Sequence, residues 1–176
     1  MGWMADETGL GKIEANYVAL TPLSHLRRAA QVFPTHMAVI YGAHRVNYAT
    51  YYERCTRLAS ALVAMGVKSG EVVATLIPNL PAQAEAHFGV PACGAVLNTI
   101  NIRLDIATVA YIFDHGGARV VLVDPQFLEL AEAAAGLAGA VLLRLGVDRH
   151  RRPLLLLGRP DGLLDLGVEL LLGLGR

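Results

Sequence analysis

The sequence is poor in several residue types that define common protein classes. Its 176 residues include two cysteines and 6% aromatic residues, and the formal net charge is zero. A neutral chain gives no reason to expect nucleic acid or an acidic membrane as the main partner. Cys55 and Cys93 are far apart and form no CxxC pair, so we expect two reduced thiols that behave as small core hydrophobes.

No segment of the chain has the features of a membrane-crossing or secretory sequence. The N-terminus, "MGWMADETGL", lacks both a basic region and an apolar region, which predicts no signal peptide and a cytoplasmic location. The longest apolar pieces near the C-terminus, at 154–157 and 170–172, are far shorter than the about 20 residues that span a bilayer. We therefore expect no transmembrane segment.

Turn and capping residues other than Gly, Pro and Asp are missing from the C-terminal part of the chain. From Leu137 to Arg176, leucine, glycine and arginine fill 28 of 40 positions, and Ser, Thr, Asn, Gln and Lys are absent. Packed domains need such residues in their turns and caps. We interpret 136–176 as a low-complexity tail that is not a native continuation, for example a product of translation in another frame. A helix on a membrane surface is the alternative.

The body of the chain, residues 17–135, alternates between two hydrophobic periods. Continuous apolar, β-branched runs at 72–77, 95–98 and 119–123 are typical of buried parallel strands. Stretches with apolar residues three and four positions apart lie between these runs and predict amphipathic helices. The alternation predicts an α/β fold with a parallel sheet covered by helices on both faces, which makes three layers. Residues 1–16 are expected to be a flexible N-terminus.

Local signals place the ends of several helices. Thr21 before Pro22 predicts a helix start, Asn47 is expected to cap a second helix, and Asn79 with Pro81 is expected to open a third. Asp105 is expected to cap a helix that stops at Gly116-Gly117. The stretch "AVIYGAHRVNY" (38–48) predicts two short strands around a turn at Gly42.

The motifs that usually reveal a catalytic or cofactor site are absent. "TGLGK" (8–12) resembles a phosphate-binding loop, but its first glycine and its magnesium-binding hydroxyl are missing, so we interpret it as a terminal segment. No dinucleotide fingerprint, zinc spacing or nucleophilic triad is recognisable. His87 is expected to bond the backbone of its own helix rather than a ligand, and His115 to complement a helix C-terminus.

Several blocks, in order, resemble the start of the AMP-forming acyl-CoA synthetases, a family of adenylate-forming ligases. They are "LTPLSHLRRAAQVFP", "AVIYGAHRVNYATYYERCTRLASALVAMGVKSGEVVATLIPN", "EAHFGVPACGAVLNTINIRLD" and "ARVVLVD". The likeness runs from about Tyr17 to Ala135 and is closest to the fatty-acid and methylmercaptopropionate-type CoA ligases. It implies part of the large N-terminal domain of such an enzyme. Thr50 departs from the family, which commonly has Glu there. The change weakens the capping box of the helix and affects no residue that takes part in the reaction.

The resemblance implies a two-step reaction that uses ATP, Mg²⁺ and CoA. A carboxylate is converted to an acyl-adenylate, and the CoA thiol then displaces AMP. The family places its Ser/Thr/Gly-rich ATP-binding loop, a Thr-Glu pair, a ribose-binding Asp and a catalytic Lys beyond the residues that match. Lys12 and Lys68 are the only lysines here, and neither has that context. We therefore predict no catalytic, cofactor-binding or metal residue in this chain, and no cofactor for the chain alone.

One polar block, "NTINIRLD" (98–105), follows an apolar run, and its polar side chains need an explanation. We interpret Asn98, Thr99, Asn101 and Arg103 as scaffold that bonds loop backbone and leads into the helix at Asp105. A ligand crevice is instead expected beside Ile77-Pro78-Asn79, because open α/β sheets bind ligands at the carboxyl ends of their strands.

Two functional hypotheses follow from the sequence. The first is a fragment of an ATP-dependent acyl-CoA ligase that is inactive alone. The second is a non-catalytic interaction or scaffold protein derived from that fold. Because some members of the family dimerise through this region, the resemblance also allows a homodimer. The acyl-chain specificity does not follow from the residues that match.

Overall fold

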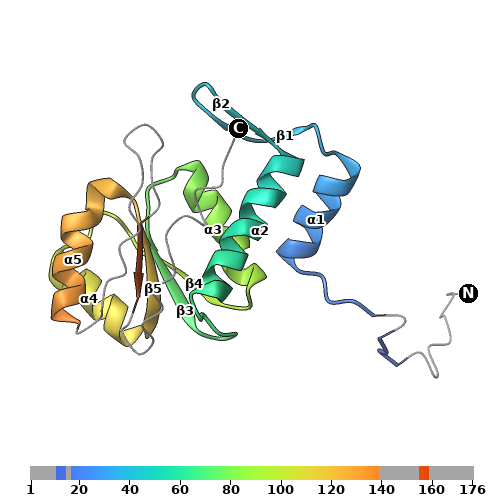
Figure 1. The fold of residues 1–176 in the computed structure, drawn as a ribbon. Coiled ribbons are helices and arrows are strands. Elements are labelled where there is room, and N and C mark those ends of the chain that lie inside the picture. Colours follow the sequence, from blue (N-terminus) through green and yellow to red (C-terminus); the bar gives the residue numbers. More distant parts are fainter. Residues whose placement is uncertain (1–10, 15–16, 139–154, 159–176) are drawn as a thin grey trace, which may run out of the picture.

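The protein is a three-layer α/β structure, as the sequence predicts. The computed structural model describes residues 11–14, 17–138 and 155–158, the last of these as backbone only. A four-stranded sheet with the order β4-β3-β5-β6 forms the middle layer. Figure 1 shows helices α2 and α3 on one side of this sheet and α4 and α5 on the other.

Three parallel strands form the centre of the sheet. They are β3 (Val72–Leu76), β4 (Val96–Thr99) and β5 (Ala118–Val123), within one residue of the predicted runs at either end. β3 is central and pairs in parallel with β4 on one side and β5 on the other. Its residues are almost fully buried, which explains the continuous apolar character of the run. In the described part of the chain, β4 is an edge strand.

The N-terminal elements lie beside the three layers. Helix α1 (Pro22–Val32) begins with a capping box in which the Thr21 and Ser24 side chains each bond the other's backbone N–H. A separate antiparallel hairpin follows, made of β1 (Met37–Tyr41) and β2 (His44–Asn47). Gly42 in its turn has φ of 57°, a conformation that glycine adopts without a steric penalty.

Helices α2 (Tyr48–Ala64) and α3 (Pro81–Ala92) cover one face of the sheet. Asn47 caps α2 as predicted, since its side-chain oxygen accepts a hydrogen bond from the Thr50 N–H at 2.9 Å. The two helices and the facing strand residues share one apolar cluster. Its buried members are Leu58, Leu62, Val67, Val73, Ile77, Ala86, Val90, Ala95, Val120 and Leu122.

Helices α4 (Ile106–His115) and α5 (Leu128–Leu137) cover the opposite face. The short 3₁₀ helix η1 (Pro125–Phe127) leads into α5. Alternate residues of β3 and β5 point to this second layer, as the two-residue period of a strand requires. The buried cluster here is Ala74, Leu76, Ile100, Val109, Ala110, Phe113, Ala118, Val121, Val123, Ala131 and Ala134.

The start of α3 differs from the prediction. Pro81 is the first helical residue, but the N-cap is Leu80 rather than Asn79, and Leu80 provides no side-chain hydrogen bond to the first turn. The turn between β3 and α3 explains the difference, because the Leu80 N–H bonds the Pro78 carbonyl at 2.7 Å. That tight bend places Asn79 before the cap, and its side chain is exposed.

A fourth strand comes from the segment that we assigned to the tail. β6 (Leu155–Gly158) pairs antiparallel with β5, so the sheet is mixed at this edge. Helix α5 also crosses the boundary that we placed at residue 136, since it runs to Leu137. Most of the tail, 139–154 and 159–176, lies outside the described residues. Within the described part of the chain, no helix is long and apolar enough to cross a membrane.

Candidate functional site

A cleft lies at the carboxyl ends of β3 and β4, where the sequence predicts a ligand crevice. Its volume is about 270 Å³, and it is lined by the turn after β3 (77–79) and the turn after β4 (100–103). Parallel strands end on the same side of the sheet, which brings these two turns together. Of the residues in the polar block, Asn101 and Arg103 line this cleft, whereas Asn98 and Thr99 do not.

The cleft combines an apolar floor with polar groups at its mouth. Ile77 and Ile100 are buried, and the side chains of Asn79, Asn101 and Arg103 are exposed. No acidic residue is among the described residues that line it. An arginine with two amides and no carboxylate is suited to an anion and offers no good ligand for Mg²⁺.

Local hydrogen bonds orient the groups around Arg103. The Asn101 side-chain oxygen accepts a hydrogen bond from the Arg103 N–H at 3.0 Å. Asp105 caps α4 as predicted, accepting from the Thr108 N–H at 3.0 Å and from the Thr108 hydroxyl at 2.7 Å. The hydrogen bond from the Thr108 side chain lowers the pKa of the Asp105 carboxyl. Both oxygens of Asp105 are thus engaged at the helix.

The other two residues of the polar block serve the sheet. A methyl group placed on Gly116 would lie 2.9 Å from the Asn98 side-chain nitrogen, so Asn98 packs against the end of α4. Thr99 is paired with Thr75 in the ladder between β4 and β3. The structure therefore divides the block into two residues that pack against neighbouring elements and two that line the cleft.

Two buried polar atoms flank the same turn between β3 and α3. Thr75 Oγ1 near the end of β3 and Gln83 Oε1 in the first turn of α3 have no hydrogen-bond partner among the described residues. Thr75 is 1% exposed and Gln83 is 8% exposed. Buried polar atoms without partners are uncommon in folded proteins, and these two single out the β3–α3 turn.

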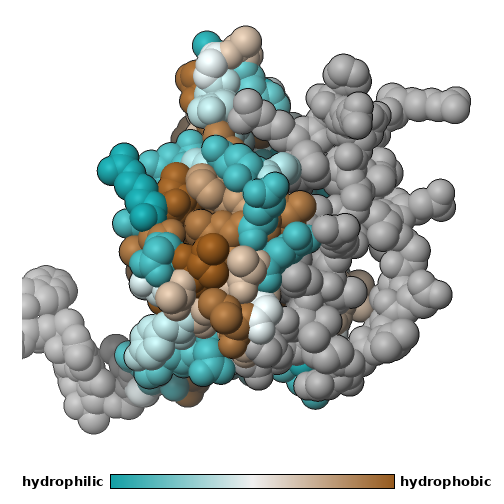
Figure 2. Space-filling view, turned by 90° about the vertical axis from the view of Figure 1, so that its left-hand side faces the viewer, coloured by the Kyte–Doolittle hydropathy of each residue, from teal (hydrophilic) through white to brown (hydrophobic). Residues whose placement is uncertain are grey.

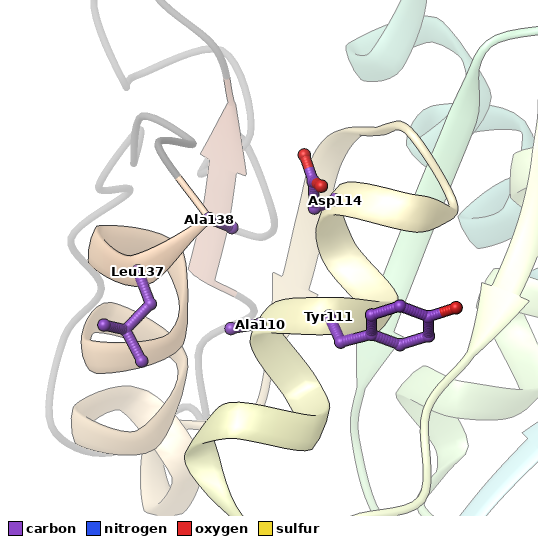
Figure 3. Close-up of a pocket in the computed structure, with 5 residues that line it drawn as sticks. All are labelled: Ala110, Tyr111, Asp114, Leu137 and Ala138. Atoms are coloured by element: carbon purple, nitrogen blue, oxygen red, sulfur yellow. The ribbon is translucent and has the colours of Figure 1, made fainter.

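A second hollow lies between α4 and α5 and suits an anion poorly. Its volume is about 240 Å³, and Ala110, Tyr111, Asp114, Leu137 and Ala138 line it. Figure 3 shows these residues, with the Tyr111 ring directed away from α5. That ring stacks on His115, with 5.2 Å between the ring centroids. The lining contains one carboxylate and no cation, so we take the cleft beside Arg103 as the candidate site.

The reactive side chains of α2 are used to hold α3 in place. The Tyr51 hydroxyl donates a hydrogen bond to the Ala84 carbonyl at 2.7 Å, and Arg54 pairs with Glu85 through two bonds of 2.6 and 3.1 Å. Burial raises the pKa of the Cys55 thiol to about 12 and also raises the pKa of the Tyr51 hydroxyl. A thiol that stays protonated is a poor nucleophile. The contact between α2 and α3 is therefore structural.

The histidines have the structural surroundings that we expected. His87 Nδ1 lies 2.7 Å from the Gln83 carbonyl oxygen one helical turn earlier. His115 is in the last turn of α4, where a cation would complement the helix dipole. Among the described residues, no three His, Cys, Asp or Glu side chains gather in a way that could hold a metal ion.

The segment 8–12, which resembles a phosphate-binding loop, lies mostly outside the described residues. Only its Gly11 and Lys12 are described. The Lys12 ammonium lies 4.5 Å from the centroid of the Tyr17 ring. This is the distance of a cation–π contact.

The fold and the order of blocks define a class of proteins. The sequence model of the AMP-binding enzyme family matches residues 26–158, and the chain therefore belongs to this family. The match passes residue 135, where the resemblance ended in our sequence analysis, and takes in β6. CoA ligases are among its relatives and structural neighbours.

Relatives of known activity match about a quarter of their own length. The chain is 52% identical over 127 residues to the peroxisomal acetate/butyrate–CoA ligase of Arabidopsis thaliana, which covers 72% of this chain and 22% of the relative. It is 43% identical over 150 residues to an acetate–CoA ligase of Humulus lupulus, which covers 85% and 26%.

Solved structures show the same fold. A fatty acyl CoA synthetase of Mycobacterium tuberculosis superposes with a TM-score of 0.61 at 30% identity, covering 63% of this chain and 22% of that one. A benzoate CoA ligase of Burkholderia xenovorans superposes with a TM-score of 0.64 at 26% identity, covering 66% and 24%. These neighbours bear out the predicted likeness to the N-terminal domain of adenylate-forming ligases.

Proposed function

We propose that this chain is the N-terminal portion of an ATP-dependent acyl-CoA ligase. In the first step a carboxylate oxygen of the substrate bonds the α-phosphorus of ATP, and the bond to pyrophosphate breaks. In the second step the CoA sulfur bonds the acyl carbon, and AMP leaves. The observation that carries the proposal is the family match over residues 26–158, together with relatives that are CoA ligases.

The proposed substrate is a carboxylic acid of small or moderate size. The names of three relatives specify acetate or butyrate, acetate, and trans-cinnamate. These acids share the carboxylate that the first step needs and differ in the rest of the molecule. We therefore propose the activation of a carboxylic acid, with fatty acids as one class to be tested.

We further propose that the chain makes no acyl-adenylate by itself. Adenylation needs donors and cations placed around the phosphates of ATP, and the loss of one such group commonly costs a factor of about 10²–10³ in rate. The cleft provides one cation, Arg103, and no acidic ligand for Mg²⁺. Neither lysine of the sequence lies in the context of the family's catalytic lysine. The resemblance implies that the remaining groups belong to the roughly three quarters of the relatives that this chain does not match.

A non-catalytic interaction protein is the alternative, and one surface favours it. Figure 2 shows apolar side chains gathered on the face formed by α4 and α5. Tyr111 is 63% exposed and Leu137 is 69% exposed on these helices. Apolar surfaces of this kind often mark contacts with other proteins. An interaction role would use this face. A ligase role would instead use the cleft at the carboxyl ends of β3 and β4.

The location and the oligomeric state remain part of the proposal. We propose a cytoplasmic location, whereas the Arabidopsis and Petunia relatives are named as peroxisomal. Fluorescence microscopy of the tagged chain distinguishes the two compartments. A homodimer is tested by the molar mass measured in light scattering.

Exchange of radiolabelled pyrophosphate into ATP tests the ligase proposal. The chain is assayed with acetate, butyrate, benzoate, cinnamate and long-chain fatty acids. The other frames of the encoding DNA after residue 135 are searched for the Ser/Thr/Gly-rich loop, and a version that contains it is assayed beside the chain. We expect exchange only in the longer version. Exchange by the chain alone would overturn its proposed inactivity, and a longer version without activity on any acid would overturn the ligase assignment.

A further inference from the structure

We propose that helix α1 and the β1–β2 hairpin bind the surface of an anionic lipid bilayer, with the tip of the hairpin entering the headgroup region. These elements, residues 17–47, are called the N-terminal unit below. They lie beside the three layers at one end of the molecule, and the hairpin projects past the end of α2 (Figure 1). Peripheral binding of this kind needs no membrane-spanning helix. It is independent of the ligase function, because it is measured without catalysis.

The N-terminal unit is positively charged although the whole chain is neutral. From residue 15 to residue 52 the sequence contains Arg27, Arg28 and Arg45 and no Asp or Glu. All three arginines are exposed. The zero net charge, from which we expected no acidic membrane as the main partner, therefore averages over an uneven distribution. Each cation held near an anionic bilayer adds to the attraction between the two surfaces.

Exposed apolar side chains are concentrated in the same unit. Of the fifteen large apolar side chains that are exposed in the described part of the chain, eight belong to it: Tyr17, Val18, Leu20, Val32, Phe33, Met37, Ile40 and Tyr41. The core beneath the unit is small, because its buried residues Leu26 and Val46 pack only on Tyr51 and Cys55 among the fully buried side chains. A surface that is both apolar and cationic is typical of proteins that bind at a membrane interface.

The register of the hairpin places a polar or charged ring or fork beside each apolar residue of the tip. Ile40 is opposite Arg45, and Tyr41 is opposite His44. Residues directly opposite in an antiparallel pair project from the same face. Ile40 is 62% exposed and Tyr41 is 46% exposed. A long cationic side chain can keep its charge at the level of the lipid phosphates while its apolar neighbour lies deeper, so this pairing suits a bilayer surface.

The turn at the tip is already formed in the absence of lipid. Gly42 has φ of 57°, and the Arg45 guanidinium donates a hydrogen bond to the Gly42 carbonyl. A guanidinium has five N–H donors, so others remain for a phosphate. A preformed tip binds without a large cost of ordering. The aliphatic Ile40 favours a bilayer over single-stranded nucleic acid, which is bound through stacked aromatic side chains.

Sedimentation of the full 176-residue chain with lipid vesicles tests the proposal. Vesicles of phosphatidylcholine alone are compared with vesicles that contain about one third phosphatidylserine, at low and at physiological salt. Arg28→Gln and Ile40→Thr change the N-terminal unit, and Lys68→Gln and Val96→Thr are the matched controls. Lys68 is an exposed cation in the loop before β3, and Val96 is an exposed β-branched residue of β4. Samples without vesicles correct for self-association, and circular dichroism checks that each variant is folded.

We expect the parent to bind the phosphatidylserine vesicles at least about tenfold more tightly than phosphatidylcholine alone, and less tightly as salt rises. Arg28→Gln should weaken binding about fivefold, because one charge near the surface is lost. Ile40→Thr should also weaken it about fivefold, because less apolar surface enters the bilayer. Lys68→Gln and Val96→Thr should stay within about twofold of the parent. Equal weakening by Arg28→Gln and Lys68→Gln, or full binding by Ile40→Thr, would overturn the proposal.

The depth of the hairpin tip distinguishes insertion from contact by charge alone. A nitroxide label is attached at the turn through Ala43→Cys, and at an exposed position of α5 through Ala133→Cys. Both chains carry Cys93→Ser, and Cys55 is left in place because it is buried. On binding, the label at 43 should become more accessible to oxygen, which dissolves in lipid, and less accessible to a water-soluble nickel chelate. The same response at both positions, or at neither, would overturn the insertion of the tip.

Other occupants of this surface are tested in the same assay. Single-stranded RNA that binds the chain as tightly as the vesicles do, at equal phosphate concentration, would make nucleic acid the partner and overturn the proposal. The longer version of the ligase is also sedimented, because the added chain competes to cover the N-terminal unit. Binding by both versions supports lipid as the partner, whereas loss of binding in the longer version would make the unit an internal contact of the ligase. Vesicle binding without pyrophosphate exchange in the longer version leaves this proposal standing and removes the ligase function.

Discussion

At the scale of single residues, the closest packing is found where α3 crosses α2. A methyl group on Gly89 would lie 2.7 Å from Leu58 Cδ2 and 3.0 Å from the Cys55 carbonyl oxygen. Real Cβ atoms do not approach other atoms this closely, so the two helices can meet here only because residue 89 is glycine. The Tyr51 hydroxyl and the pair of Arg54 with Glu85 fix the same crossing.

Substituting Gly89 should therefore destabilise the fold. We expect Gly89→Ala to lower the free energy of unfolding by about 1–3 kcal/mol through overpacking, measured by urea denaturation. Gly136→Ala is the matched control, because Gly136 is also helical and nothing lies within 4 Å of a methyl group there. The control should be neutral or stabilising by up to about 1 kcal/mol. Equal losses in both variants would show that the contact with Leu58 is unimportant.

The two cysteines should differ in reactivity, and the buried one should contribute to the pH dependence of stability. Cys55 is buried and Cys93 is half-buried, so a thiol reagent should modify Cys93 first and Cys55 only on unfolding. Burial raises the pKa of the Cys55 thiol to about 12. Its contribution to stability is thus complete below the pKa of a free thiol, about 8.5, and is lost as pH rises toward 12.

Urea midpoints measured from about pH 8 to about pH 11 check this contribution. They should fall less steeply in Cys55→Ala than in the parent. The same slope in Cys55→Ala and the parent would remove the assignment to Cys55.

At the scale of elements, helix ends are the features that local sequence specifies best. Thr21, Asn47 and Asp105 each cap the helix that we assigned to them, and Gly116-Gly117 ends α4. Capping depends on side chains within three residues of the helix start, so the information is local. Asn79 failed as a cap because the bend at Pro78 depends on how β3 meets α3.

Cap removal should have a measurable cost at α2. We expect Asn47→Ala to reduce the free energy of unfolding by about 1 kcal/mol, because the Thr50 N–H loses its acceptor. Asn47→Asp keeps an acceptor oxygen at the same place and should preserve most of the stability. Thermal denaturation of the three proteins makes the comparison. A loss in Asn47→Asp as large as in Asn47→Ala would mean that the bond to Thr50 does not stabilise the helix.

The sheet and its crevice could be predicted from the sequence, whereas the contents of the crevice could not. Apolar runs fix the three parallel strands, and the rule of strand ends then places a crevice beside Ile77-Pro78-Asn79. The split of the polar block, with Asn98 against Gly116 and Arg103 on the cleft, depends on side-chain directions around a turn. The pairing of Arg54 with Glu85 joins residues 31 positions apart and has no local signal.

At the scale of the whole molecule, the C-terminal segment decides how far the family fold extends. The family match ends at residue 158, and β6 pairs with β5 along Val120–Val123. The nine-letter alphabet of the tail begins earlier, at residue 137, so composition and fold place the boundary differently. Our proposal that the tail is not a native continuation is therefore tested best by two truncations.

Removing residues 159–176 should leave the free energy of unfolding unchanged. Removing residues 139–176 should lower it, because the edge of β5 then loses the backbone hydrogen bonds of β6. Urea denaturation of both truncated chains beside the parent gives the comparison. Equal stability of all three would favour the original boundary at 136, and a loss already in the shorter truncation would show that 159–176 contributes to the fold.

The edge of β4 that no described strand covers has a consequence for handling the protein. β4 gives its hydrogen bonds to β3 on one side, and its sequence, Val96-Leu97-Asn98-Thr99, contains neither the lysine nor the proline that often guards such an edge. Val96 is 53% exposed there. Strands of this kind recruit strands of other molecules, so the chain should lose solubility as its concentration rises. A charged residue at position 96, as in Val96→Lys, should raise the concentration at which it precipitates without altering its circular dichroism spectrum.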